Sequence, residues 1–276
     1  PCKRIPACIP APCRTLPILW MRISKLSLAG RVMVQTAHGA KSVLVDIDRD
    51  LLLIPNVAIH MNRQANDGYK WNPVMDVNPL LGGKNAAGKL TTLLEEAAGG
   101  KILGHDLTLY VRENARVWGM DNEYISSQAL DDLQCVWGCF RGFLNAAPGG
   151  DIPVFCALNS EEIGSRTTDG ADSTYVEDVL TRIAEGLHRN VREMLSQSFL
   201  VSADNAHAIH PNHPELADPS NAPVMGDGIV VKFNSNQRYC TDGLCAALFR
   251  QVCEKAGASV QRSEEHTSEL QSPVPI

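Results

Sequence analysis

Hydrophobic and polar positions change their spacing near the middle of the chain, so its two halves predict different structures. In the first half, short apolar runs bounded by glycine and polar turns predict strands at 31–35, 42–47, 51–54 and 106–111. One helix is expected at 89–98, where Gly99 and Gly100 end the apolar pattern. Residues 62–88 are rich in Asn, Asp, Gly and Pro, which predicts a loop. The first half is therefore expected to be a strand-rich module.

The second half alternates helical patterns with apolar strands. Strands are predicted at 152–158, 199–202 and 228–233, and helices at 131–144, 173–198 and 242–256. Between residues 173 and 198, apolar side chains recur three or four positions apart, as they do on one face of an amphipathic helix. Helices that alternate with apolar strands favour a layer of helices packed on a sheet. The predicted fold class is therefore α/β.

Composition narrows the range of partners. The 276 residues are 44% hydrophobic and carry 31 acidic against 25 basic side chains, a net charge of −6 that argues against nucleic acid or an anionic membrane as the partner. No apolar run reaches the roughly 18 residues that a membrane helix needs, and the first residues lack the apolar stretch of a signal peptide. Nine cysteines without a CxxC pair indicate a reducing compartment, which we expect to be the cytoplasm.

Acidic residues are concentrated in three segments that lie where predicted strands end or helices begin. Asp131 and Asp132 open a predicted helix, whereas residues 159–165 and 202–212 each follow an apolar strand. Ligands gather in loops beyond the carboxyl ends of strands in α/β sheets. Carboxylates that converge there repel one another unless a cation lies between them. The pattern therefore predicts a pair of divalent cations, for which zinc, a metal that accepts carboxylate oxygens and imidazole nitrogens, is the candidate.

Each of these segments also has an ordinary structural explanation. Asp131 could cap a helix whose dipole Asp132 favours, and Glu161 and Glu162 could be solvated loop charges. The histidines of the third segment could simply be exposed. The combination of the three segments favours the metal site, and two adjacent glutamates allow one to bind metal while the other takes a proton from water.

Seven stretches of the sequence, in this order, match one known family: LSLAGRV (26–32), LVDIDRDLLLIPNVAIHMNR (44–63), GHDLTLY (104–110), LDDLQC (130–135), NSEEIGSRTTDGADS (159–173), SADNAHAIHPNH (202–213) and VVKFNSNQRYCTD (230–242). Together they resemble the M18 family of zinc aminopeptidases. The resemblance covers roughly residues 26–261. It implies a phosphorylase/hydrolase-like α/β/α catalytic domain, incomplete in this chain, with an inserted β-rich dimerisation domain. It also implies a homo-oligomer, a dodecamer in the family, that removes single N-terminal residues from peptide substrates.

The resemblance divides the chain into four parts. Residues 1–28 are a Pro- and Cys-rich stretch atypical of the family, residues 29–117 the β-rich dimerisation domain, and residues 118–261 part of the catalytic domain. Residues 262–276 begin with RSEEHTSELQS, which looks like the translation of a sequencing-adapter oligonucleotide, so we expect this tail to be non-native. Because the chain also begins at Pro1 rather than Met, its ends are not expected to be natural ends.

The resemblance also assigns roles at the metal site, which would hold two Zn2+ ions when complete. Asp131 would bridge the two ions and be joined to Asp132 by a cis peptide bond. Glu162 and Asp204 would be further metal ligands. Glu161 would be the general base that activates the bridging water.

Substrate-side positions follow from the same resemblance. His207 and Lys232 would lie near the substrate, and His60 would reach the active site of a neighbouring subunit. The family's His-x-Asp-x-Pro and Met-His-Ser segments, each of which supplies a histidine ligand, have no counterpart in these 276 residues. We therefore expect little activity from this chain. The alternative is a non-catalytic relative that acts in assembly or cargo binding, and the preferred N-terminal residue of the substrate stays open.

Overall fold

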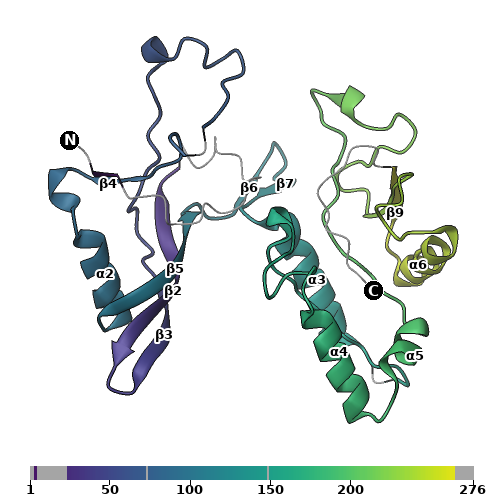
Figure 1. Ribbon diagram of the computed structural model, residues 1–276. Coiled ribbons are helices and arrows are strands. Elements are labelled where there is room, and N and C mark those ends of the chain that lie inside the picture. Colours follow the sequence, from purple (N-terminus) through teal and green to yellow (C-terminus); the bar gives the residue numbers. More distant parts are fainter. Residues whose placement is uncertain (1–2, 5–23, 73, 148, 265–276) are drawn as a thin grey trace. The chain divides into compact units, whose positions relative to one another are not determined.

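The computed structural model describes residues 3–4, 24–72, 74–147 and 149–264, which form two compact units (Figure 1). The first unit ends at Gln128 and the second begins at Ala129. Most of the predicted stretch 1–28, and the predicted tail from residue 265 onward, lie outside the described residues. The predicted domain boundary after residue 117 falls inside a short strand, so the hairpin that this strand forms belongs to the first unit.

A three-stranded antiparallel sheet organises the first unit. Its central strand β2 (Leu26–Thr36) pairs with β3 (Gly39–Asp46) on one side and with β5 (Ile102–Val111) on the other. A two-residue turn joins β2 to β3, and Thr36 pairs with Gly39 across it. The strands predicted at 31–35, 42–47 and 106–111 are confirmed, but β2 begins earlier, at Leu26. Three of the added residues, Leu26, Ser27 and Leu28, are fully buried, and the sequence pattern did not reveal this.

The hydrophobic core of the first unit lies between this sheet and α2 (Lys89–Ala98). Ten buried apolar residues form it: Leu26, Leu28, Val32, Val34, Val45, Leu52, Ile54, Leu94, Leu107 and Leu109. Burying a side chain of this size stabilises a protein by about 1.5–3 kcal/mol, so this cluster is the main source of stability in the unit. The prediction of a helix at 89–98 is confirmed. Gly99 ends it in the left-handed conformation (φ 70°) and its N–H donates to the carbonyl oxygen of Glu95.

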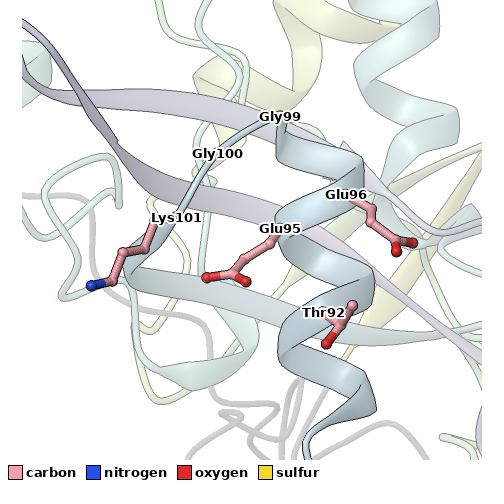
Figure 2. A pocket seen from close by; sticks show the side chains of 6 residues that line it. All are labelled: Thr92, Glu95, Glu96, Gly99, Gly100 and Lys101. Atoms are coloured by element: carbon pink, nitrogen blue, oxygen red, sulfur yellow. The ribbon is translucent and has the colours of Figure 1, made fainter.

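The residues that follow α2 form a surface hollow with the last turns of the helix (Figure 2). Charged and small residues line it, namely Thr92, Glu95, Glu96, Gly99, Gly100 and Lys101. None of them belongs to the predicted site. The hollow is therefore a feature of the helix end, where two glycines turn the chain toward β5.

Shorter elements complete the first unit. β1 (Lys3–Arg4) pairs with β4 (Leu80–Gly82), and β6 (Arg116–Trp118) forms a hairpin with β7 (Tyr124–Ser126). Two 3-10 helices, η1 (Ile59–Met61) and η2 (Lys84–Ala86), lie in the long connection between β3 and α2. The strand predicted at 51–54 is wrong as a separate strand. Its residues form only isolated bridges, between Leu52 and Leu26 and between Leu53 and Leu80.

The second unit combines helices with a short parallel sheet. Its helices are α3 (Leu130–Asn145), α4 (Tyr175–Gly186), α5 (Val191–Ser196) and α6 (Gly243–Ala256), with the 3-10 helices η3 (Glu161–Ile163) and η4 (Pro214–Leu216) between them. β8 (Ile229–Phe233) pairs in parallel with β9 (Val260–Glu264). The predicted helices at 131–144 and 242–256 and the strand at 228–233 are confirmed. β9 was not predicted, and it includes the first three residues of the predicted tail.

Two predicted strands of the second unit are wrong. Residues 152–158 and 199–202 form no strand in the described part of the chain, and only Asn159, which bridges to Gly170, pairs nearby. A strand exists only where a neighbouring strand satisfies its backbone N–H and C=O groups, and the described residues place none beside these two segments. Their apolar side chains are correspondingly exposed, as at Ile152 and Leu200.

The long helix predicted at 173–198 is also wrong, because it is two helices. His188 adopts a left-handed conformation (φ 53°) after α4, and Asn190 then begins α5. The Asn190 side chain accepts hydrogen bonds from the backbone N–H groups of Arg192 and Glu193, which is the role of an N-cap. An apolar spacing that continues across 187–190 hid this break from the sequence pattern.

Within the described ranges, no helix is both long enough and apolar enough to cross a membrane.

Substituting Gly30 with alanine is expected to destabilise the first unit. Gly30 lies in β2 with φ 150°, and a Cβ there would collide with the carbonyl oxygen of Asp106 and lie 2.9 Å from Leu107 Cα. We expect a loss of about 2–3 kcal/mol, since backbone atoms on a paired strand cannot move aside. Hydrogen exchange measured by mass spectrometry should then accelerate in peptides from β2 and β5.

The matched control is Gly104→Ala on β5, where a Cβ would meet no atom within 4 Å. This variant should exchange as the wild type does. Equal protection in the Gly30→Ala and Gly104→Ala variants would show that a Cβ at position 30 does not disturb the pairing of β2 with β5.

Candidate functional site

Three aspartates of the second unit come together at the start of α3. Carboxylate oxygens of Asp131, Asp132 and Asp204 all lie within 4.8 Å of one another. Asp131 and Asp132 are joined by a cis peptide bond, the arrangement that the family resemblance implies, and both have non-helical φ and ψ angles. Asp204 comes from the loop after residues 199–201. The prediction that acidic residues from separate segments converge is therefore met by Asp131 and Asp204.

Burial, and then the proximity of these carboxylates, disfavours their charged forms. Burial, followed by the neighbouring Asp204, raises the pKa of Asp131 to about 6. Burial also raises the pKa of Asp132, although a hydrogen bond with the Cys135 thiol opposes that shift. A site that makes its own carboxylates harder to ionise is one in which an added positive charge is stabilising.

Lys232 on β8 supplies one such charge. Its Nζ lies 2.8 Å from Asp204 Oδ2 and donates to the backbone carbonyl oxygen of Asn205 at 2.9 Å. The Lys232 side chain is 12% exposed and that of Asp204 30%, so the ion pair is partly shielded from water. The resemblance assigned Lys232 to the substrate, and the structure places its ammonium group against a predicted metal ligand.

Neutral hydrogen bonds frame the same group. The Asn205 side-chain amide donates to the carbonyl oxygen of Leu130 at 2.9 Å, and the Cys135 thiol donates to Asn205 Oδ1 at 3.1 Å. Burial, and then the hydrogen bond with Asp132, raise the pKa of the Cys135 thiol to about 12. The thiol therefore stays protonated at neutral pH, and its single proton lies between two acceptors, the Asn205 amide oxygen and the Asp132 carboxylate. Sequence reasoning missed both Asn205 and Cys135 as parts of the site.

The residues present fit a divalent cation. Asp132 Oδ1 is buried and has no hydrogen-bond partner, although buried carboxylate oxygens are almost always paired. A cation among the three carboxylates would satisfy this oxygen and remove their mutual repulsion. Carboxylate oxygens suit zinc as well as harder cations. Asp132, which the sequence reasoning did not count as a ligand, thus joins the donors, and its position next to Asp131 was the only signal available.

Glu161 and Glu162 lie in η3, after Ser160 in the left-handed conformation (φ 62°). The loop is closed by hydrogen bonds from Gly164 N–H to the Glu161 carbonyl oxygen and from Ser165 N–H to the Ser160 carbonyl oxygen, both 2.8 Å. Both glutamates are exposed. Glu162 is close enough to contribute to the raised pKa of Asp131, but its carboxylate is not in the group of three. Its role as a metal ligand stays a prediction.

The two predicted substrate-side histidines lie in different units of the chain. His207 is exposed in the loop that carries Asp204, and His60 lies in η1 of the first unit. His210 and His213 interact with each other, with ring centroids 5.2 Å apart, and His213 Nδ1 lies 2.9 Å from Glu215 Oε1. The substrate-side roles of His60 and His207 therefore stay predictions.

The mixed helix-and-sheet fold and the carboxylate group together define an α/β protein whose residues suit a divalent cation. The model of a known family, described as "Aminopeptidase I zinc metalloprotease (M18)", matches residues 18–270. The chain therefore belongs to the M18 peptidase family. The match extends beyond the predicted start of the tail at residue 262.

Individual relatives agree with this assignment. A probable M18 family aminopeptidase 2 of Clostridium acetobutylicum is 36% identical over 265 residues, which are 90% of this chain and 61% of that protein. A chain in the cryo-EM structure of the Ape4 and Nbr1 complex is 32% identical, with a TM-score of 0.79 over 92% of this chain and 55% of that one. A chain of the mApe1 dodecamer of yeast is 22% identical, with a TM-score of 0.73 over 91% and 59%. The chain thus spans about three fifths of the length of the curated relative.

Replacing Lys232 with methionine is expected to lower the thermal stability of the metal-free chain. Asp204 would lose its ammonium partner while Asp131 and Asp132 stay nearby, and removal of one member of a shielded ion pair is destabilising. We expect Tm in EDTA at pH 7 to fall by about 2–4 °C. Added Zn2+ should reduce the difference, because a cation replaces the lost positive charge.

The control is Lys255→Met on α6, an exposed lysine of the same unit, whose Tm should match that of the wild type. If Lys232→Met melted at the wild-type temperature in EDTA, the ion pair would have no part in holding Asp204.

Proposed function

We propose that this chain is part of a metal-dependent aminopeptidase that releases single N-terminal residues from peptides. The observation that carries the proposal is the convergence of Asp131, Asp132 and Asp204, one of whose oxygens is buried without a partner. Membership of the M18 family supports the same function. The family description names zinc, and we propose two Zn2+ ions for each complete site.

The residues that would hold zinc are Asp131, Glu162 and Asp204, with Asp132 as a further donor. Zinc, when bound, supplies a Lewis acid that polarises the scissile carbonyl and favours deprotonation of water. Glu161 would take the proton from the attacking water and deliver it to the leaving amine. Its exposure on η3 suits that role, because a general base must be able to reach both solvent and substrate.

Substrate contacts are proposed for three residues outside the metal ligands. His207 lies three positions after Asp204 on one loop, so a substrate carbonyl near the metal would be within reach of that loop. Lys232 would contact the substrate once a bound metal neutralises the Asp204 carboxylate in place of the ammonium group. His60 would act in the site of a neighbouring subunit.

A homo-oligomer follows from the same proposal. The first unit would be the inserted dimerisation domain of the phosphorylase/hydrolase-like fold, and the complete protein would form a dodecamer, as yeast mApe1 does. The cysteines in the described part of the chain are free thiols, which supports a cytoplasmic location. The two histidine segments that this sequence lacks lead us to propose that the chain by itself hydrolyses peptides weakly or not at all.

Zinc binding separates the roles of the two adjacent glutamates. Glu162→Gln should retain less Zn2+ than the wild type after dialysis, because a neutral amide is a poorer ligand than a carboxylate. Glu161→Gln should retain as much as the wild type, since its carboxylate is proposed to move protons only. Atomic absorption measures the bound metal, and Glu177→Gln on α4 is the exposed control.

Hydrolysis of amino-acid p-nitroanilides completes the experiment. Robust turnover by this chain that a chelator abolishes would refute the proposal that the chain is inactive. A wild-type chain that binds no Zn2+ would refute the metallopeptidase site. If such a chain still assembled in light-scattering measurements, the non-catalytic alternative would be favoured.

A further inference from the structure

We propose that Asn205 is the positioning residue that holds the carboxylate of Asp204 against Asp131 and Asp132, and that the Cys135 thiol fixes the orientation of its amide. This inference rests on the proposed function, because it concerns how the metal ligands are held. It adds two residues to which the family resemblance assigned no role.

Asn205 connects three parts of the second unit. Its side-chain NH2 donates to the carbonyl oxygen of Leu130, the residue directly before Asp131. Its side-chain oxygen accepts from the Cys135 thiol, one turn into α3. Its backbone carbonyl oxygen accepts from Lys232 Nζ, which also binds Asp204. One residue thereby ties the loop of Asp204 to the start of α3 and to β8.

This link opposes the electrostatic repulsion among the three aspartates. The three aspartates repel one another when charged, and the loop that carries Asp204 has no strand pairing in the described residues to hold it in place. The two side-chain hydrogen bonds of Asn205 are partly buried, and they go to a thiol and a backbone carbonyl oxygen rather than to a carboxylate. The Asn205 side chain therefore holds the loop close without using its own amide to bind a carboxylate.

Only a primary amide satisfies both contacts. Asn offers a donor and an acceptor on one planar group, whereas a carboxylate would place its oxygens against the Leu130 carbonyl and add a fourth negative charge. An apolar residue would remove the hydrogen bonds to both the Leu130 carbonyl and the Cys135 thiol. The thiol selects the orientation of the amide, since it donates to the oxygen and leaves the NH2 group to face Leu130.

The test compares metal affinity among variants of this chain. Co2+ is the probe, and its visible absorption band reports binding without any need for turnover. Asn205→Ala should bind Co2+ about 10–100-fold more weakly than the wild type, the usual effect of removing a group that orients metal ligands. Cys135→Ala should also bind more weakly, whereas Cys135→Ser, which keeps a donor, should restore most of the affinity. Cys139→Ala, an exposed cysteine on the same helix, is the matched control.

The outcomes separate this inference from the proposed function. A wild-type chain without Co2+ binding would refute the metal site itself. Wild-type binding with an unchanged affinity in Asn205→Ala would overturn the positioning role alone. If Asn205→Ala failed to fold, as judged by circular dichroism in EDTA, the comparison of Cys135→Ala with Cys135→Ser would test the inference instead. Equal affinities of Cys135→Ala and Cys135→Ser would then overturn the inference.

Discussion

The repulsion among three aspartates held within 4.8 Å of one another is the constraint on which the site depends. Lys232 offsets part of it through an ion pair with Asp204, and Asn205 holds the loop with neutral hydrogen bonds. Neither of these interactions supplies a hydrogen-bond partner for the buried Asp132 Oδ1. Both the geometry and the electrostatics therefore favour a cation among the three aspartates. The fold brings their charges together and leaves one carboxylate oxygen without a hydrogen-bond partner.

The two units differ in how their apolar residues are used. In the first, β2 contributes four buried apolar side chains to the core, and α2 covers that core with Leu94. In the second, buried apolar side chains are few among the described residues, and α3 exposes Leu133 and Trp137 on its surface. The segments 152–158 and 199–202 have the composition of buried strands without the pairing that would make them strands.

Much of the fold was predictable because its signals are local. Gly99 ends α2 because a left-handed residue is needed there, and Asp242 begins α6 because its carboxylate accepts the N–H of Cys245. The break between α4 and α5 was not predictable from apolar spacing, which continues through His188. The hairpin β6–β7 was missed because strands of three residues carry too little pattern, and its stability comes from contacts such as that between Trp118 and Tyr124.

The candidate site, like the fold, could be predicted only in part. The family, the acidic segments and the candidate ligands Asp131 and Asp204 could be inferred from the sequence, because those side chains occur in motifs of fixed spacing. The three-dimensional fold was needed to show that Asp132 joins them, that Lys232 pairs with Asp204, and that Asn205 and Cys135 link the loop to α3. The hydrogen bonds among these residues join positions 28 to 75 apart in the sequence. A local sequence pattern cannot predict which distant residue a side chain contacts, because the fold of the whole chain determines which residues lie next to each other.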